Sequence, residues 1–388
     1  MKFDPIVAPP SEAELKGRLD RVRARMAEAG LDRYVAFSPD NIYYLTNFAN
    51  IVHERPFVLV ISRSGPPQFV VPQLEQPHVR TRSIGELELI PYFEFPAPAG
   101  REWSDRFKAL FGPGERVGVE SVCPLQVYAQ TPGERVCIDI IDDVRMIKSD
   151  YEIGRHVYAC GVATDAHNLL LSEARPGLGM AEMSSRIRGY IMQRLLADDP
   201  SLNPLATRIV AVFQPGSVSH DPHNFSNIDM RMEEGGPHVS IVNAVMNGYG
   251  AEVERTFFLG HVPDEARRAF DVMSEGRRLA FDAAMPGALL SDVDRKVNDY
   301  FRRAGMGDRM LHRTGHGMGV TAHEAPFFAE GYDRSIEKGM CLTIEPGIYI
   351  EGVGGFRHSD TVLIGDEGPV QLTGGPLELD ALTFPVRA

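Results

Sequence analysis

Over roughly the first 150 residues, hydrophobic and polar positions follow one repeating pattern. Short apolar runs alternate there with amphipathic segments, and residues 11–30 read as a charged helix with Ser11 as its cap and Gly30 as its stop. Strands are expected in the apolar runs at 34–38, 56–62, 67–72, 116–121 and 137–141, and a helix over 41–48. Strands separated by helices predict an α/β domain with a largely buried sheet, which we assign to residues 1–149.

This pattern changes near residue 150, where a long helical periodicity begins. Strands and helices now come in groups, which predicts an α+β domain over residues 150–388 with a curved, mostly antiparallel sheet. Its helices are expected at 150–174, 180–197, 264–284 and 291–304, and its strands within 238–250, 254–260, 340–351 and 360–365.

Composition narrows the class of protein. The chain has 388 residues, 43% hydrophobic and 24% charged, as is typical of globular proteins. Its formal net charge of −13 argues against nucleic-acid binding. The first thirty residues lack the apolar core of a signal peptide, and no long uncharged apolar run occurs, so we expect a cytoplasmic protein without a membrane span.

A strand near residue 250 carries closely spaced carboxylates. In GYGAEVERTFFLG, residues 248–260, Glu252 and Glu254 are two apart and Thr256 follows. Side chains two apart on a strand point to the same face, so these groups should crowd into one place. A metal ion, a proton or a cationic substrate could each relieve their mutual repulsion.

Histidines gather in two loops that are rich in glycine. Imidazole titrates near neutral pH, so such groups indicate proton transfer or metal ligation rather than a polar surface. The first loop holds His220, Asp221 and His223, and the second holds His312, His316, His323 and Glu324.

Two later segments add charged groups in apolar surroundings. Glu345 stands in the strand-like MCLTIEPGIYI, and Arg357 and His358 stand in GGFRHSDTVLI after a glycine-rich turn. Carboxylates are rarely buried without a partner, so Glu345 is a candidate active-site group. Arg357 and His358 are expected to reach the same centre.

The order of these motifs resembles one enzyme family. An HN loop, GY-x(5)-RT, GHGMG-x(3)-HE, IEPG and G-x-R-x-x-D follow one another as in the "pita-bread" fold of creatinase, prolidase and aminopeptidase P. The likeness spans almost all of 150–388, and NIYYLTNF resembles the N-terminal domain of these enzymes. It implies an α/β N-terminal domain, a pita-bread catalytic domain and a homodimer whose active site is shared between subunits.

The metallopeptidase branch of this family binds two divalent metals with two aspartates, a histidine and two glutamates. Carried onto this sequence, that ligand set is degenerate, because an amide and a hydroxyl replace two carboxylates. The five positions are Asn243, Glu252, His316, Glu345 and Ser359. The resemblance therefore predicts no metal cofactor, with a divalent ion such as Mn, Co, Fe or Zn as the alternative.

The metal-free creatinase branch matches at other positions. The resemblance places His223 as the catalytic histidine and Glu254 and Glu345 as the carboxylates that hold a guanidinium group. Arg55 falls on an arginine that reaches the substrate carboxylate in the neighbouring subunit. Phe327, however, stands where creatinase has its other arginine. We further expect four residues to line the substrate site: Glu252, His316, His323 and Arg357.

The leading interpretation is a metal-independent, creatinase-like hydrolase that cleaves a C–N bond of a small zwitterion, a carboxylated amidine or guanidino compound such as creatine. Carboxylates would localise the charge of the amidine, and His223 would act as general base and then general acid. One alternative is an Xaa-Pro-type metallo-aminopeptidase or dipeptidase with an altered metal site. Another is a binding protein of the same fold without catalysis.

Overall fold

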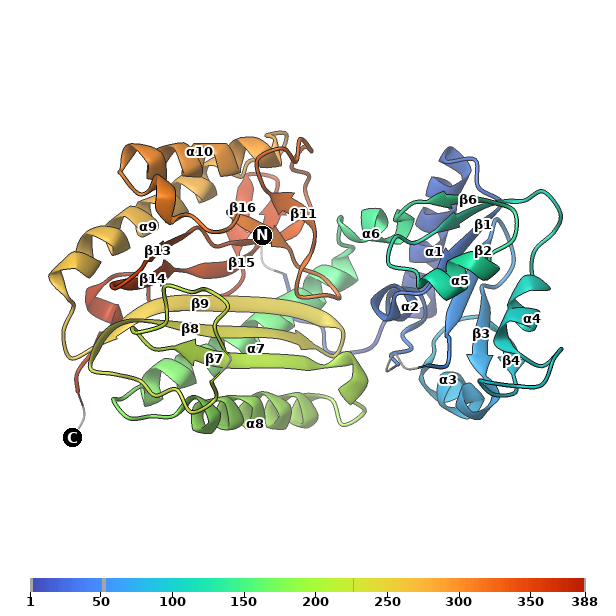
Figure 1. Ribbon diagram of the computed structural model, residues 1–388, viewed down its shortest axis with the longest axis horizontal. Helices are drawn as coiled ribbons and strands as arrows, with labels where there is room; N and C mark the ends of the chain where they lie inside the picture. The colour runs from blue at the N-terminus through green and yellow to red at the C-terminus, as the bar shows by residue number, and fades with distance from the viewer. Residues whose placement is uncertain (1–2, 51–53, 226, 387–388) are drawn as a thin grey trace. The chain divides into compact units, whose positions relative to one another are not determined.

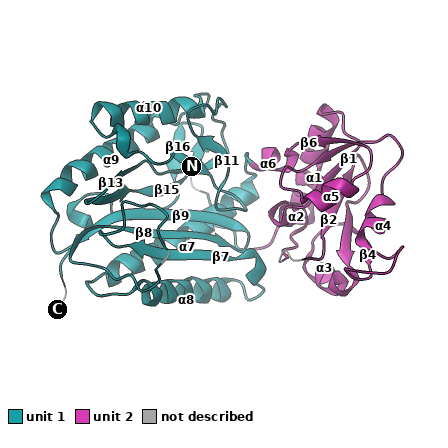
Figure 2. Cartoon of the chain, viewed as in Figure 1, with its two compact units in different colours: residues 1–7, 146–388 teal, residues 8–145 magenta. Residues whose placement is uncertain are grey.

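The chain divides into two compact units (Figure 2): residues 8–145 form one, and residues 1–7 with 146–388 form the other. The computed structural model describes residues 3–50, 54–225 and 227–386. Each unit is described by itself.

The 8–145 unit is built on a mixed sheet in the order β4-β3-β2-β1-β5-β6. Strand β1 runs parallel to β5 and antiparallel to β2, and helices alternate with the strands along the chain as the apolar runs predicted. The strands are β1 (Arg33–Ala36), β2 (Val58–Ser62), β3 (Gln68–Pro72), β4 (Glu88–Tyr92), β5 (Arg116–Val119) and β6 (Glu134–Cys137). The helices are α1 (Glu12–Glu28), α2 (Pro39–Thr46), α3 (Gln76–Arg82), α4 (Trp103–Lys108), α5 (Leu125–Gln130) and α6 (Ile140–Arg145).

Local signals set the ends of these elements well in one case and poorly in another. The Ser11 side chain accepts a hydrogen bond from the Glu14 amide and caps α1, as predicted. The run 137–141 is not a strand throughout, because β6 ends at Cys137 and α6 begins at Ile140. Isoleucines suit a buried helix face as well as a strand, so periodicity over five residues cannot separate the two.

The other unit contains the curved, largely antiparallel sheet of the pita-bread fold, in the order β11-β10-β12-β15-β9-β8-β7. Its strands are β7 (Arg208–Gln214), β8 (Gly235–Met246), β9 (Tyr249–Leu259), β10 (Gly315–Gly317), β11 (Glu324–Phe328), β12 (Cys341–Ile344) and β15 (Ser359–Gly365). Strands β16 (Gly368–Gln371) and β17 (Thr383–Phe384) pair with β15 and β9, and β13 (Gly347–Ile350) forms a hairpin with β14 (Gly354–Arg357).

Helices cover this sheet in two pairs (Figure 1). α7 (Asp150–Glu173) packs against β8 and β9 and α8 (Met180–Asp198) against β7, whereas α9 (Asp264–Ala283) and α10 (Leu290–Arg303) pack on each other and against later strands. A capping box between Ser149 and Glu152 begins α7, which agrees with the polar start expected there.

A tight turn sets the register of the central hairpin. Asn247 and Gly248 join β8 to β9, and both have positive φ angles, 47° and 91°. An Asn-Gly pair with these angles is the preferred two-residue hairpin turn. The resulting register places Asn243 opposite Glu252.

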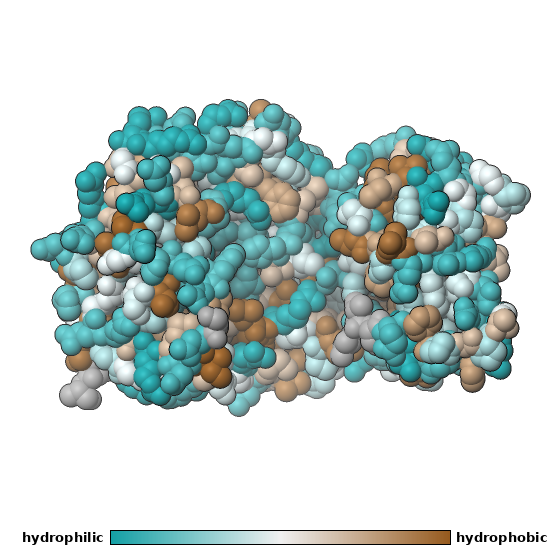
Figure 3. All heavy atoms as spheres, in the orientation of Figure 1, coloured by the Kyte–Doolittle hydropathy of each residue, from teal (hydrophilic) through white to brown (hydrophobic). Residues whose placement is uncertain are grey.

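The core of this unit lies between the sheet and its helices, where α7, α9 and the central strands contribute the buried apolar side chains. On the face shown in Figure 3, hydrophilic residues predominate and hydrophobic ones form small separate groups. None of the helices in the described ranges is long and apolar enough to span a membrane.

Candidate functional site

Glu252 lies at the centre of the sheet, on β9 between β8 and β15. Its side chain is buried, and both oxygens receive hydrogen bonds from neighbouring strands. The Ser359 hydroxyl donates to Oε1 at 2.6 Å, and the Asn243 amide donates to Oε2. Asn243 and Ser359, two of the degenerate metal positions, therefore both act as donors to Glu252.

Glu254 lies two residues along the same strand and is held in an ion pair. Arg357 donates from Nη2 to Glu254 Oε1 at 3.1 Å, and its Nε forms an ion pair with Oε2. The third nitrogen of Arg357 donates to the Tyr349 hydroxyl at 3.1 Å, and that hydroxyl also lies 2.7 Å from His312 Nε2. Glu254 thus already has a cationic partner within this chain.

His316, His323 and Glu345 approach the carboxylates from the other half of the sheet. His316 Nε2 is 3.1 Å from Glu345 Oε1 and 3.9 Å from Glu252 Oε2. The other ring nitrogen, Nδ1, donates to the Gly317 carbonyl, which turns Nε2 toward the carboxylates. The His323 ring stacks on that of His316, with centroids 3.7 Å apart.

The protonation of these groups reflects their crowding. Burial raises the pKa of Glu252, and the charge of Glu345 adds to the effect. Burial alone would lower the pKa of His316, but Glu345 and Glu252 outweigh it and raise that pKa to about 9. In turn, although burial opposes ionisation, the charge of His316 holds the pKa of Glu345 well below its usual range. Without another cation, the site therefore holds a proton on His316.

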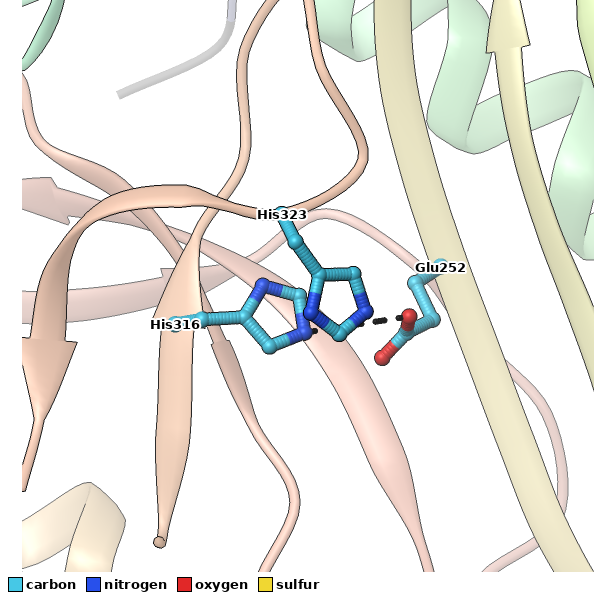
Figure 4. A group of neighbouring side chains, drawn as sticks. All are labelled: Glu252, His316 and His323. Carbon is cyan, nitrogen blue, oxygen red and sulfur yellow. Dashed lines mark ion pairs between the residues drawn. The ribbon is translucent and has the colours of Figure 1, made fainter. Parts of the chain in front are cut away.

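These donors fit a divalent metal ion. Figure 4 shows Glu252 on β9 pointing toward the rings of His316 and His323, and one ligand atom from each lies within 4.8 Å of the others. Glu252, Glu254 and Glu345 form a second such group. Carboxylate oxygen and imidazole nitrogen suit Mn, Co, Fe or Zn, and a bound ion would neutralise the buried negative charge.

A second ion would find a poorer set of ligands. Asn243 and Ser359 offer a neutral amide and a hydroxyl, and each already donates its hydrogen to Glu252. Hard divalent ions need anionic oxygens to offset their loss of water. The residues present therefore fit one ion better than two.

Two further residues that the sequence assigned to the site are His223 and Arg55. His223 is exposed in the loop between β7 and β8. Burial is the main cause that lowers the pKa values of His312 and His323, and the charge of His223 makes a smaller contribution in the same direction. Arg55 belongs to the 8–145 unit, where it pairs with Glu54 and with Glu94 at 2.6 Å. Its role toward a substrate stays a prediction.

Two contributors, Tyr349 and Lys148, were not expected from the sequence. Tyr349 links His312 to Arg357, and its two-residue spacing from Gly347 in IEPGIYI offered a weak signal of a shared strand face. Lys148 forms a buried ion pair with Glu324 at 2.9 Å, in which both side chains are nearly inaccessible. Lys148 and Glu324 are 176 residues apart in the sequence, so no local pattern predicts their contact.

Comparison with known proteins agrees with this architecture. Residues 155–366 match the model of metallopeptidase family M24, and residues 18–147 match the creatinase/prolidase N-terminal domain. The chain is 27% identical to a Xaa-Pro dipeptidase of Pyrococcus furiosus, over 94% of this chain and 100% of that protein. It is 26% identical to YkvY, a putative dipeptidase of Bacillus subtilis, over 93% and 99% of the two chains.

A solved structure supports the same relationship. The prolidase from Pyrococcus furiosus superposes with a TM-score of 0.76 and 26% identity, covering 91% of this chain and 99% of that one.

Two expectations from the sequence are wrong. The predicted metal-independent, creatinase-like hydrolysis is contradicted by the relatives, which are named dipeptidases and align with this chain over nearly their whole length. The prediction of no cofactor is contradicted by the metallopeptidase family match and by the groups of side chains that could hold a metal. Short motifs such as Glu254 in ERT carried the creatinase reading, but the structure pairs Glu254 with Arg357. The chain belongs to metallopeptidase family M24.

Proposed function

We propose that this protein is a metal-dependent dipeptidase of the Xaa-Pro type that works with one divalent ion. The observation that carries the proposal is the convergence of two buried carboxylates, Glu252 and Glu345, on His316, with Glu254 beside them. Burying so much negative charge is costly unless a cation accompanies it. The names and full-length coverage of the relatives support peptide-bond hydrolysis as the reaction.

Glu252, His316 and Glu345 would hold the ion, with His323 beside them. When bound, such an ion polarises a carbonyl group and lowers the pKa of water at the site. Burial and the charge of His316 lower the pKa of His323 to about 4, so its ring is neutral at pH 7 and its nitrogens are available to a metal ion or a hydrogen bond. Arg357 and Tyr349 fix Glu254 at the edge of this centre.

One ion per chain is the expected stoichiometry. Both oxygens of Glu252 accept hydrogen bonds, one from Asn243 and one from Ser359, and neither donor carries a negative charge that could bind a second ion. A variant with both Asn243→Asp and Ser359→Glu would add two anionic ligands. We expect this variant to bind two ions where the natural chain binds one.

The test begins with elemental analysis of the purified protein after dialysis against Mn²⁺, Co²⁺ or Zn²⁺. Hydrolysis of Ala-Pro is then followed with and without a chelator. One ion per chain, with turnover that chelation removes and the ion restores, supports the proposal. Turnover that survives complete metal removal, or metal-loaded protein that cleaves no Xaa-Pro dipeptide, refutes it.

A matched pair of variants ties the activity to the site. Glu252→Gln keeps the shape of the side chain but removes its charge, and we expect loss of both metal binding and turnover. Glu351→Gln makes the same change at an exposed position on the β13–β14 turn, and we expect no effect.

A further inference from the structure

A cavity beside α9 is lined by residues whose buried polar atoms have no partner. Its volume is about 370 Å³, and it lies between α9, the residue that joins β14 to β15, and the segment after β16. Within the described residues, three of the buried side-chain atoms without a hydrogen bond belong to its lining: Ser274 Oγ, Arg277 Nε and His358 Nε2. Buried polar groups are nearly always hydrogen-bonded, so three of them on one cavity indicate a polar ligand.

His358 was expected at the metal centre, but its ring lies on the other face of the sheet. Arg357, one residue earlier, pairs with Glu254, and successive side chains on extended backbone point to opposite faces. The His358 ring packs edge-on against Phe270 of α9, with centroids 5.2 Å apart, and the residue is only 1% exposed. This imidazole is therefore directed toward α9 and the cavity.

The ring of His358 presents a hydrogen-bond acceptor. Burial and the charges of Arg255 and Arg277 hold the pKa of His358 well below its usual range, so the ring is neutral. A hydrogen bond joins the ring to the Thr256 backbone, and because Nε2 has no partner, Nδ1 makes this bond. A neutral imidazole that donates from one nitrogen accepts at the other. A ligand must therefore bring an N–H or O–H group to Nε2.

The inner end of the cavity carries an excess of positive charge. Arg255 and Arg277 share one buried carboxylate, that of Asp360, at 2.9 Å and 2.5 Å. Among the described residues these are the ion pairs of the two arginines, so one positive charge is left over. Arg277 Nε also keeps a hydrogen to donate. A buried charge is costly without a partner, which favours an anionic group beside Arg277.

The rim of the cavity carries negative charge. Asp271 and Glu378 line it, both are exposed, and neither forms an ion pair within the part of the chain that the structure describes. A third carboxylate, Glu275, is paired with Arg278 at 2.6 Å. A ligand with an anion at its inner end and a cation at its outer end would match this distribution of charge.

We propose that this cavity binds a free α-amino acid. The carboxylate of the ligand accepts hydrogen bonds from Arg277 Nε and the Ser274 hydroxyl, and its ammonium group donates to His358 Nε2 and faces Asp271 and Glu378. A simple carboxylate would leave His358 without a donor, and a simple amine would leave Arg277 without an acceptor. Dipeptide hydrolysis releases free amino acids, so the choice of alanine and proline as probes rests on the proposed function.

Calorimetric titration with L-alanine and L-proline tests the site in the metal-loaded wild type and in Glu252→Gln. Binding at the metal centre should be lost in Glu252→Gln, whereas binding in the cavity should remain. In the Glu252→Gln background we expect Ser274→Ala to weaken amino-acid binding about fivefold, as for one hydrogen bond, and Arg277→Gln to weaken it about 10- to 100-fold. N-acetyl-L-alanine and L-alaninamide, which each lack one charge, should bind at least about tenfold more weakly than L-alanine.

Variants at the rim keep the test decisive if Arg277→Gln does not fold. Asp271→Asn combined with Glu378→Gln leaves the buried charges intact and should weaken binding, whereas Glu265→Gln, at an exposed position in the first turn of α9, should not. Amino-acid binding that survives in Glu252→Gln and weakens in the cavity variants supports the assignment. No binding of either amino acid, or an affinity that Ser274→Ala and the rim variant leave unchanged, overturns it. If no dipeptide is cleaved, the proposed function fails while these titrations still decide the cavity.

Discussion

Lowering the pH from 9 to 7 should weaken divalent-ion binding at this site about fiftyfold. His316 donates from Nδ1 to the Gly317 carbonyl, so its Nε2 is the atom available to a metal. Glu345, at 3.1 Å, and Glu252 raise the pKa of His316 to about 9, so at pH 7 this nitrogen carries a proton. A metal ion must displace that proton before it can bind.

The magnitude follows from linkage between the two equilibria. Well below pH 9 His316 is almost entirely protonated, so each further pH unit downward lowers the apparent affinity for the metal ion about tenfold. At pH 7 the affinity is therefore about a hundredfold below that of the deprotonated site, and about fiftyfold below its value at pH 9, where half of the protein carries the proton. Above pH 9 the nitrogen is free and the affinity should level off.

Isothermal titration with Mn²⁺ at several pH values measures this dependence, and repeating it in buffers of different ionisation enthalpy counts the protons released. We expect at least one proton per ion at pH 7. His323, whose pKa lies at about 4, should contribute none, so His323→Asn should keep the slope. Affinity that is constant between pH 7 and 9, with no proton release, would show that the ion does not bind through His316.

Three further predictions concern the folded state. Burial lowers the pKa values of His156 and His238 to about 4. Their contribution to the free energy of unfolding is therefore fully present above the unfolded pKa of about 6.5 and is lost as the pH falls toward 4, by about 3 kcal/mol for each. Urea unfolding at pH 7 and at pH 4 measures this loss. Lys148→Met should destabilise the protein by about 3–5 kcal/mol because the buried carboxylate of Glu324 loses its cationic partner. Adding Glu324→Gln should restore part of the loss in a double-mutant cycle. Gly250→Ala should lower the melting temperature, because a Cβ there would lie 2.4 Å from the Met318 sulfur; an unchanged melting temperature would contradict this packing.

The elements that follow local rules were predictable from the sequence. The helices at 150–174, 180–197, 264–284 and 291–304 match α7 to α10 within one residue at either end, because capping and a 3.6-residue period are read within a single segment. The Asn247-Gly248 turn likewise determined the central hairpin. The two-residue spacing of Glu252 and Glu254 correctly predicted that they share a buried face.

The chemistry of the site depended on partners that are distant in sequence. Glu254 looked available to a substrate, but Arg357 lies 103 residues further along the chain and occupies it.

The sequence by itself therefore determined the fold class, the principal helices and the types of side chain that meet at the site. Tertiary structure alone decided which carboxylate is already neutralised and which donors Glu252 keeps. The physical reason is that backbone preferences act over a few residues, whereas hydrogen bonds and ion pairs form between whichever groups the packed sheet brings together.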